Sequence, residues 1–265
     1  MKTSVSLSIF DAPKGAPILF SGVTEDNFQT IKELGYDGID LFVDDPFSDK
    51  AKKAVELLKK YDLGIGVVMP AALAGQGLFL GDEDKAVREE CIKKISEIID
   101  FTSEIGGMVS LGLVRGSKKP NETIEHFNQK FVNSCEKLIN KSDIPLLIEP
   151  INRYEINTIN SVHEGIEFIE KYNLPLYLMI DTFHMNIEDI NIYKSIEDAI
   201  KLTKHIHFLD SNRLAPSMGH LDMKAIYMLI KQLQYNGYLC LEALPKPSSY
   251  ECAKNGAIFF DKVKK

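Results

Sequence analysis

The sequence predicts an α/β protein, a single (β/α)8 TIM barrel that spans residues 1–265. Three observations lead to this fold class. The length of 265 residues is close to the roughly 250 typical of such a barrel. Short β-branched or aliphatic runs alternate with longer amphipathic stretches along the whole chain, which is the pattern of βα units and a parallel sheet. Eight such units can be counted, each about the size of one strand, one helix and two short connections.

The eight runs define the expected strands in chain order. They cover residues 5–10, 38–43, 64–69, 108–114, 145–149, 176–181, 205–210 and 238–243. Helices are expected between them. Two are especially clear, at 82–105 and 122–139, because apolar residues recur there at helical spacing. The longest irregular segments, 11–22 and 70–81, are rich in Ala, Gly and Pro and each follows a strand. We therefore expect both at the C-terminal mouth of the barrel, where barrel enzymes keep their sites.

The charge and the cysteines limit the classes of function. The formal net charge is −7 and no Lys/Arg-rich stripe interrupts the acidic background, which argues against nucleic-acid and anionic-membrane partners. The four cysteines show no close pairing that would suggest a zinc knuckle or a redox dithiol. No apolar run approaches the roughly 18 residues that a membrane-spanning helix needs. A cytoplasmic enzyme with a small-molecule substrate is the expectation, and a homo-oligomer stays open.

Polar side chains stand at or near the ends of four consecutive predicted strands: Glu149, Asp181, His207 and Glu242. In a closed barrel these strand ends surround one point at the mouth. Three carboxylates gathered there would repel one another unless a cation neutralised them. Three carboxylates and one imidazole form an oxygen-rich set that suits Mn²⁺, Mg²⁺ or Co²⁺ better than a structural zinc ion. We therefore predict a divalent metal site, with Mn²⁺ as the first expectation.

A second set of polar residues follows these ligands in the loops. Glu155, His184 and Arg213 each stand a few residues past a predicted ligand and could reach a bound polyol. Each also has an ordinary structural interpretation. Glu155 could cap the next helix, His184 could be a surface imidazole, and Arg213 could pair with a nearby Asp.

Four segments together resemble one known family. They are LIEPINRYE (147–155), IDTFHMNIE (180–188), HIHFLDSNR (205–213) and LCLE (239–242). They look like the sugar phosphate isomerase/epimerase family with the xylose-isomerase-like barrel, and in particular its D-tagatose 3-epimerase group. The resemblance implies that Glu149, Asp181, His207 and Glu242 bind the metal and that Glu149 and Glu242 also move the proton. It further implies that Glu155, His184 and Arg213 contact the sugar.

One branch of that family is suggested more closely. The run LGLVRG (111–116), with DSNR (210–213) and Gly219-His220, looks like the branch that epimerises keto-uronates such as D-tagaturonate and 5-keto-L-gluconate. Arg115 is then a candidate for the substrate carboxylate, since a guanidinium binds carboxylates bidentately, although a salt bridge at the barrel rim is an equal alternative. Two positions depart from the family pattern. Asp40 stands where many members have Glu, and residues 217–219 stand where many have Gly-x-Gly.

The predicted chemistry is inversion of a carbon next to a ketone, at C3 of a ketose or keto-uronate. One glutamate removes a proton to give an enediolate and the other returns a proton to the opposite face. A ketose/aldose isomerase and a keto-inositol dehydratase on the same barrel are alternatives. An abasic-site endonuclease would need further His ligands and a basic face, and a non-catalytic sugar-binding protein would need no acid/base pair.

Overall fold

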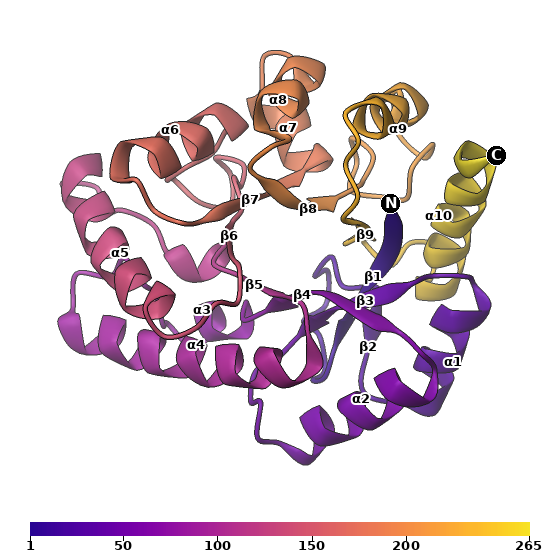
Figure 1. Ribbon diagram of the computed structural model, residues 1–265, viewed down its shortest axis with the longest axis horizontal. Coiled ribbons are helices and arrows are strands. Elements are labelled where there is room, and N and C mark those ends of the chain that lie inside the picture. Colours follow the sequence, from indigo (N-terminus) through magenta and orange to yellow (C-terminus); the bar gives the residue numbers. More distant parts are fainter.

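The computed structural model describes residues 1–265 and has eight parallel strands that close into a barrel (Figure 1). The ring closes where β1 pairs with β9. A short extra strand, β2, pairs with the C-terminal end of β1. The strands are β1 (Lys2–Ser8), β2 (Phe20–Ser21), β3 (Gly38–Phe42), β4 (Gly64–Met69), β5 (Met108–Ser110), β6 (Leu146–Ile148), β7 (Tyr177–Asp181), β8 (Thr203–His207) and β9 (Tyr238–Leu241).

Helices surround the ring of strands. They are α1 (Glu25–Glu33), α2 (Asp49–Lys60), α3 (Ala72–Gly75), α4 (Lys85–Ile105), α5 (Ile124–Ile139), α6 (Val162–Tyr172), α7 (Thr182–Glu188), α8 (Ile192–Ala199), α9 (Met223–Gln232) and α10 (Ser249–Lys264). Most begin at a Ser, Thr, Asp or Asn whose side chain accepts a hydrogen bond from a backbone N–H of the first turn. The predicted fold class is confirmed.

The predicted strands are found in order, with shifted ends. β1 begins three residues before the predicted 5–10, and β8 covers Thr203–His207 where 205–210 was predicted. The largest difference lies in the fourth predicted strand, 108–114. β5 ends at Ser110, and a 3₁₀ turn, η1 (Leu113–Arg115), follows it. Gly112 causes the break at this point: a Cβ there would lie 2.7 Å from a carboxylate oxygen of Glu149, so the backbone passes directly beside that side chain.

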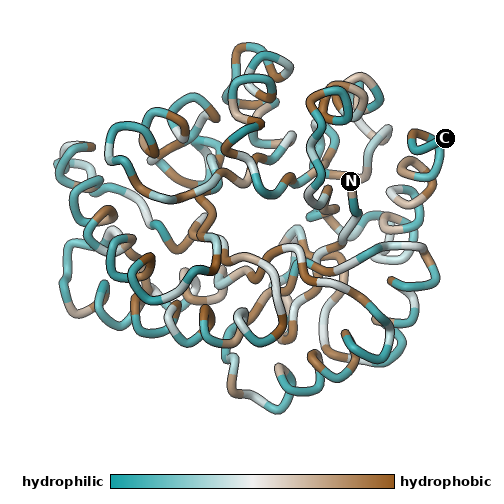
Figure 2. The backbone as a smooth tube through the Cα atoms, in the orientation of Figure 1, coloured by the Kyte–Doolittle hydropathy of each residue, from teal (hydrophilic) through white to brown (hydrophobic).

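The core has two parts. The larger part lies between the strands and the surrounding helices and comprises 62 buried apolar residues. A small second cluster contains six residues that come mostly from the strands: Ile18, Phe42, Val67, Met69, Leu147 and Met179. Figure 2 shows hydrophobic segments along the strands and many hydrophilic turns on the outer helices. The interior of the barrel is thus packed with side chains.

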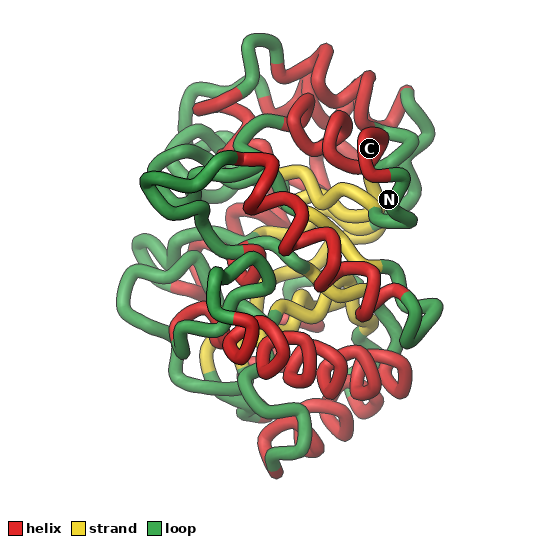
Figure 3. The backbone as a smooth tube through the Cα atoms, turned by 90° about the vertical axis from the view of Figure 1, so that its left-hand side faces the viewer, coloured by secondary structure: helices red, strands yellow, loops and turns green.

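The long connections gather at one end of the barrel, opposite the end where both termini lie (Figure 3). Both irregular segments predicted for the mouth, 11–22 and 70–81, contribute residues to the cavity that also contains Glu149 and Glu242. The first carries β2 and the second carries α3. No helix in the structure combines the length and the apolar character that crossing a bilayer would require.

Candidate metal centre and active site

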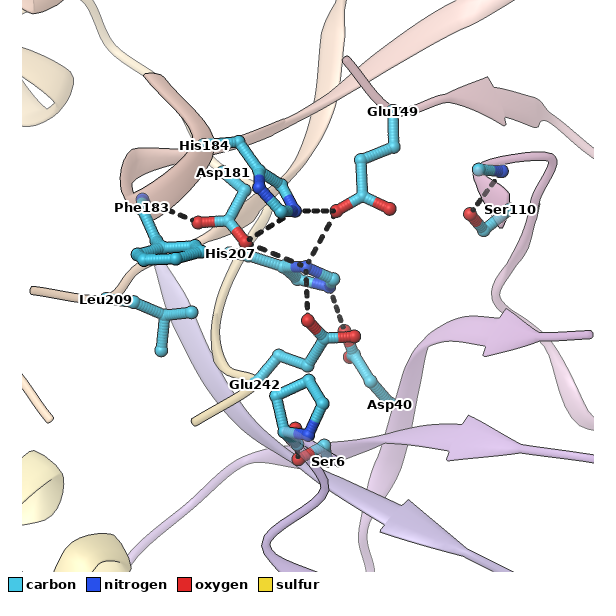
Figure 4. Close-up of polar contacts among 12 residues, drawn as sticks. Ser6, Asp40, Ser110, Glu149, Asp181, Phe183, His184, His207, Leu209 and Glu242 are labelled. Atoms are coloured by element: carbon cyan, nitrogen blue, oxygen red, sulfur yellow. Dashed lines mark hydrogen bonds and ion pairs between the residues drawn. The ribbon is translucent and has the colours of Figure 1, made fainter. Parts of the chain in front are cut away.

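The four predicted ligands converge at the mouth of the barrel. Asp181 and His207 end β7 and β8, while Glu149 and Glu242 directly follow β6 and β9. Their ligand atoms all lie within 4.8 Å of one another, and all four side chains are buried. The Nδ1 atom of His207 faces all three carboxylates, at 3.4 Å from Glu149, 3.6 Å from Glu242 and 3.9 Å from Asp181 (Figure 4). They form a candidate metal centre.

The electrostatics of this cluster fit a cation. The Oδ2 atom of Asp181 and the Nδ1 atom of His207 are buried and have no hydrogen-bond partner within the chain. Burial, together with the charges of Glu149 and Asp181, raises the pKa of Glu242 to about 8 against the opposing effect of His207 and Arg213. The pKa of Glu149 is lowered, because contacts with His207 and the charges of His184 and Arg213 outweigh its burial. Without a cation the three carboxylates cannot all remain ionised at neutral pH, so the donor set matches a divalent ion.

The three predicted sugar-binding residues line the same cavity. Nε2 of His184 lies 3.7 Å from Asp181 and 3.8 Å from Glu149, and its Nδ1 contacts the side-chain amide of Asn152 at 2.7 Å. His184 is therefore not a surface imidazole. Arg213 donates hydrogen bonds to Glu155 at 2.9 Å and to Glu242 at 3.1 Å.

The loop that carries Arg213 is shaped by a buried Asp. Asp210 accepts hydrogen bonds from the backbone N–H groups of Ser211, Ser217 and Leu221. Arg213 itself has a φ of 58°, which is unusual for a residue with a side chain. A Cβ at Gly219 would collide with the Asp210 carboxylate. Residues 217–219 depart from Gly-x-Gly only at the first position and keep Gly219, which this loop path requires. Arg213, on the same loop, lines the cavity.

Arg115 does not reach the cavity. Its side chain is fully buried and donates to the hydroxyl and carbonyl of Thr158, at 3.1 and 2.7 Å, and to the carbonyl of Glu149 at 3.0 Å. With its donors engaged inside the protein, the guanidinium has no free edge for a ligand. The interpretation of Arg115 as the partner of a substrate carboxylate conflicts with this geometry, and so does the alternative of a rim salt bridge. Arg115 instead ties η1 to the segment that follows Glu149.

The cavity has a volume of about 350 Å³ and two unlike sides. Glu149, Glu155, His184, Arg213 and Glu242 form the polar side. The opposite side is mostly apolar and is contributed by the early part of the chain, including Phe10, Ile18, Phe42, Met69, Ala72 and Leu113.

Asp40 has a role that the sequence reasoning missed. Its carboxylate is buried and lies 2.6 Å from Nε2 of His205 and 3.4 Å from Nε2 of His207. Burial would raise the pKa of this carboxyl, but the two imidazoles outweigh that effect and hold the pKa well below its usual range. A signal was present, because Asp40 is the one charged residue in the otherwise apolar run GIDLF (38–42). Its partners could not be identified without the closed barrel, because β3 and β8 do not pair and their side chains meet only inside the ring.

Comparison with known proteins agrees with this architecture. Residues 28–257 match the family model described as xylose isomerase-like TIM barrel. The chain is 25% identical over 232 residues to a 3-dehydro-D-guloside 4-epimerase of Escherichia coli K12, covering 82% of this chain and 86% of that protein. It is 26% identical over 225 residues to a ketose 3-epimerase of Arthrobacter globiformis, with coverage of 81% and 75%.

Solved structures show the same fold. The apo form of 3-keto-D-glucoside 4-epimerase from E. coli superimposes with a TM-score of 0.80 at 20% identity, covering 98% of this chain and 100% of that one. A D-allulose 3-epimerase from Methylomonas sp. in complex with D-allulose gives 0.77 at 20% identity, with coverage of 98% and 97%. The prediction of an enzyme of the isomerase class is confirmed by the relatives, which are epimerases. The chain belongs to the xylose isomerase-like TIM barrel family.

Proposed function

We propose that this protein is a metal-dependent epimerase that inverts C3, the carbon next to the ketone, of a neutral ketose. One observation carries the proposal: Glu149 and Glu242 both line the cavity and approach the same point from opposite sides of the ligand cluster (Figure 4). Inversion requires one group to take a proton from one face and a second group to return one to the other face. Two carboxylates so placed supply both.

The remaining residues have roles that follow from their positions. Glu149, Asp181, His207 and Glu242 would hold the cation, which when bound offsets the negative charge that develops on the substrate oxygens. His184 would donate a hydrogen bond to a substrate oxygen from Nε2. Arg213 and Glu155, already paired with each other, would orient the hydroxyl groups beside the reacting carbon.

The charge of the cavity favours a neutral substrate over a keto-uronate. Arg213 is the one Arg or Lys side chain among the residues that line the cavity, and both ends of its guanidinium already contact carboxylates. Arg115 is engaged elsewhere. A divalent ion would offset only two of the three ligand carboxylate charges, and Arg213 is already paired with Glu155 and Glu242, so a substrate carboxylate or phosphate would meet no unpaired cationic side chain. The apolar side, from Phe10 to Met69, suits the carbon chain of a sugar better than a second charge.

The proposal also includes the identity of the metal and the cellular location. Mn²⁺ is the ion we propose, because carboxylate oxygens suit both Mn²⁺ and Mg²⁺, whereas the imidazole nitrogen favours the transition metal Mn²⁺ over Mg²⁺. Four buried free cysteines and the absence of disulfides agree with a cytoplasmic location.

The experiment is turnover of a panel of ketoses and keto-uronates with Mn²⁺ in D₂O, followed by NMR of the products. We expect a neutral ketose to be the best substrate and deuterium to appear at C3. Label confined to C1 or C2 with formation of an aldose would make the protein an isomerase instead. Preference for a keto-uronate would refute the argument from cavity charge while leaving the epimerase assignment intact.

A further inference from the structure

A second group of polar side chains lies inside the barrel, directly below the candidate metal centre. It consists of Asp40 on β3, His205 on β8 and Ser4 on β1, and it adjoins His207. All of these side chains are completely buried. Burying polar groups costs free energy unless they form hydrogen bonds or ion pairs with one another, so we expect these contacts to serve stability or function.

The contacts divide the two nitrogens of the His207 ring between two environments. Nδ1 faces the carboxylates of Glu149, Asp181 and Glu242, as described above. Nε2 points the other way, toward Oδ2 of Asp40 at 3.4 Å (Figure 4). A nitrogen that ligates a metal must offer a lone pair, so the hydrogen of a neutral imidazole must then sit on the other nitrogen. In His207 that other nitrogen has a carboxylate oxygen at ion-pair distance but not in hydrogen-bond geometry, so a small rotation of the ring is needed to form the hydrogen bond.

Asp40 is held in place from several sides. Its Oδ1 accepts a hydrogen bond from the Ser4 hydroxyl at 3.0 Å, and its Oδ2 lies 2.6 Å from Nε2 of His205. On the neighbouring strand β4, a Cβ at Gly66 would collide with Oδ1 of Asp40 and lie 2.9 Å from the His205 ring. The glycine therefore makes room for the Asp40–His205 pair.

The same residues could be read as a second metal site, because Asp40, His205, His207 and Cys240 also bring their donor atoms within 4.8 Å of one another. The distances argue against it. Two ligands of one ion with bonds of about 2.0–2.2 Å lie roughly 3.3 Å apart in a tetrahedral site. The 2.6 Å between Oδ2 of Asp40 and Nε2 of His205 is too short for two ligands of one ion and is instead the distance of a close ion pair.

We propose that Asp40 is a positioning residue for the metal centre. It holds the ring of His207 so that the Nδ1 lone pair faces the cation, and it accepts the hydrogen on Nε2, while His205 and Ser4 hold Asp40. This inference rests on the predicted metal site but not on the reaction catalysed there. Partners of this kind typically change metal affinity 10- to 100-fold when they are removed.

The test compares two Asp→Asn variants. Asp40→Asn removes the proposed partner of His207. Asp37→Asn is the matched control, because Asp37 precedes the same strand and accepts hydrogen bonds from Thr3, away from the ligands. Affinity and stoichiometry for Mn²⁺ are measured by calorimetry on the stripped proteins, together with the melting temperature with and without Mn²⁺. We expect Asp40→Asn to bind Mn²⁺ 10- to 100-fold more weakly and to gain less in melting temperature from the ion, with Asp37→Asn within about twofold of wild type.

Several outcomes would overturn the proposal. One is wild-type affinity in Asp40→Asn, and another is a second Mn²⁺ or Zn²⁺ equivalent in the wild type that Cys240→Ala abolishes. If Asp40→Asn fails to fold, ¹⁵N NMR of the His207 ring in the Mg²⁺-loaded wild type decides. We expect the hydrogen on Nε2, and a hydrogen on Nδ1 would refute the inference. A wild type that binds no divalent ion would refute the metal site itself, and with it the proposed function.

Discussion

Binding of the metal should compete with protons, so affinity should rise with pH. In the metal-free protein, burial and the neighbouring carboxylates raise the pKa of Glu242 to about 8. The pKa of His207 is also raised well above its ordinary value, since the charge of Glu242 and contacts with Asp40 and Glu149 outweigh the effect of burial. A cation in the site needs Glu242 ionised and Nδ1 of His207 free, so at neutral pH each ion that binds should displace at least one proton.

The magnitude follows from the pKa of Glu242. A carboxyl with a pKa of about 8 is roughly 90% protonated at pH 7, and ionising it costs about 1.4 kcal/mol there and about 2.7 kcal/mol at pH 6. The Glu242 carboxyl is therefore mostly protonated below pH 8 and mostly ionised above it. The metal Kd should therefore fall about tenfold per pH unit up to pH 8 and then level off. Glu242 alone gives a change of about 25-fold between pH 6.5 and 8.5, and the His207 proton adds to it.

Calorimetry of Mn²⁺ binding at pH 6.5, 7.5 and 8.5, in buffers of different ionisation enthalpy, measures both the affinity and the protons released. Glu242→Gln is the control, because it should bind more weakly at every pH and show a shallower pH dependence that comes from His207. Equal affinity at pH 6.5 and 8.5 without proton release would refute the reasoning, since Glu242 would then be neither protonated nor displaced in the manner described.

Kinetic measurements on Glu242→Gln and three further variants test separate parts of the structure. Glu242→Gln should lower kcat by more than the 10²- to 10⁴-fold typical of general acid–base catalysis, because it removes a ligand charge as well; a smaller loss in steady-state assays would contradict its double role. Arg213→Ala should raise KM and keep metal content near wild type, and loss of the metal would mean that Arg213 is misplaced. Arg115→Met should lower the free energy of unfolding by about 3 kcal/mol in urea titrations, because buried carbonyls lose their donors, whereas unchanged stability would contradict the contacts described. Burial raises the pKa of the half-buried Asp189 carboxyl from 3.8 to about 6, so the free energy of unfolding of the wild type falls as pH rises through that range. Asp189→Asn should therefore stabilise the protein by about 1 to 2 kcal/mol above pH 6 and give no gain near pH 4. A gain in stability that does not depend on pH would contradict this cause.

Several properties of this protein are readable from local sequence. Alternating strand and helix patterns predict a parallel barrel, because each βα unit carries its own apolar periodicity and helix caps and the eight units follow one another along the chain. The candidate metal ligands can also be identified in the sequence, because Glu149, Asp181, His207 and Glu242 each come at or directly after the end of a strand. The geometry of a closed barrel places consecutive strand ends around one mouth, so the one-dimensional order already implies a three-dimensional cluster.

Other properties depend on contacts between distant segments. Arg115 lies in a motif suggestive of carboxylate binding, but the early end of β5 turns its side chain into the interior, where Thr158 and the Glu149 carbonyl receive it. Only the pairing of sheet strands brings Asp40 beneath His207. The charge balance of the cavity, on which the proposed preference for a neutral substrate rests, also depends on the contacts of Arg213 with Glu155 and Glu242 across the mouth. Sequence periodicity determines which face a side chain occupies, whereas register, strand length and loop path determine what that side chain meets.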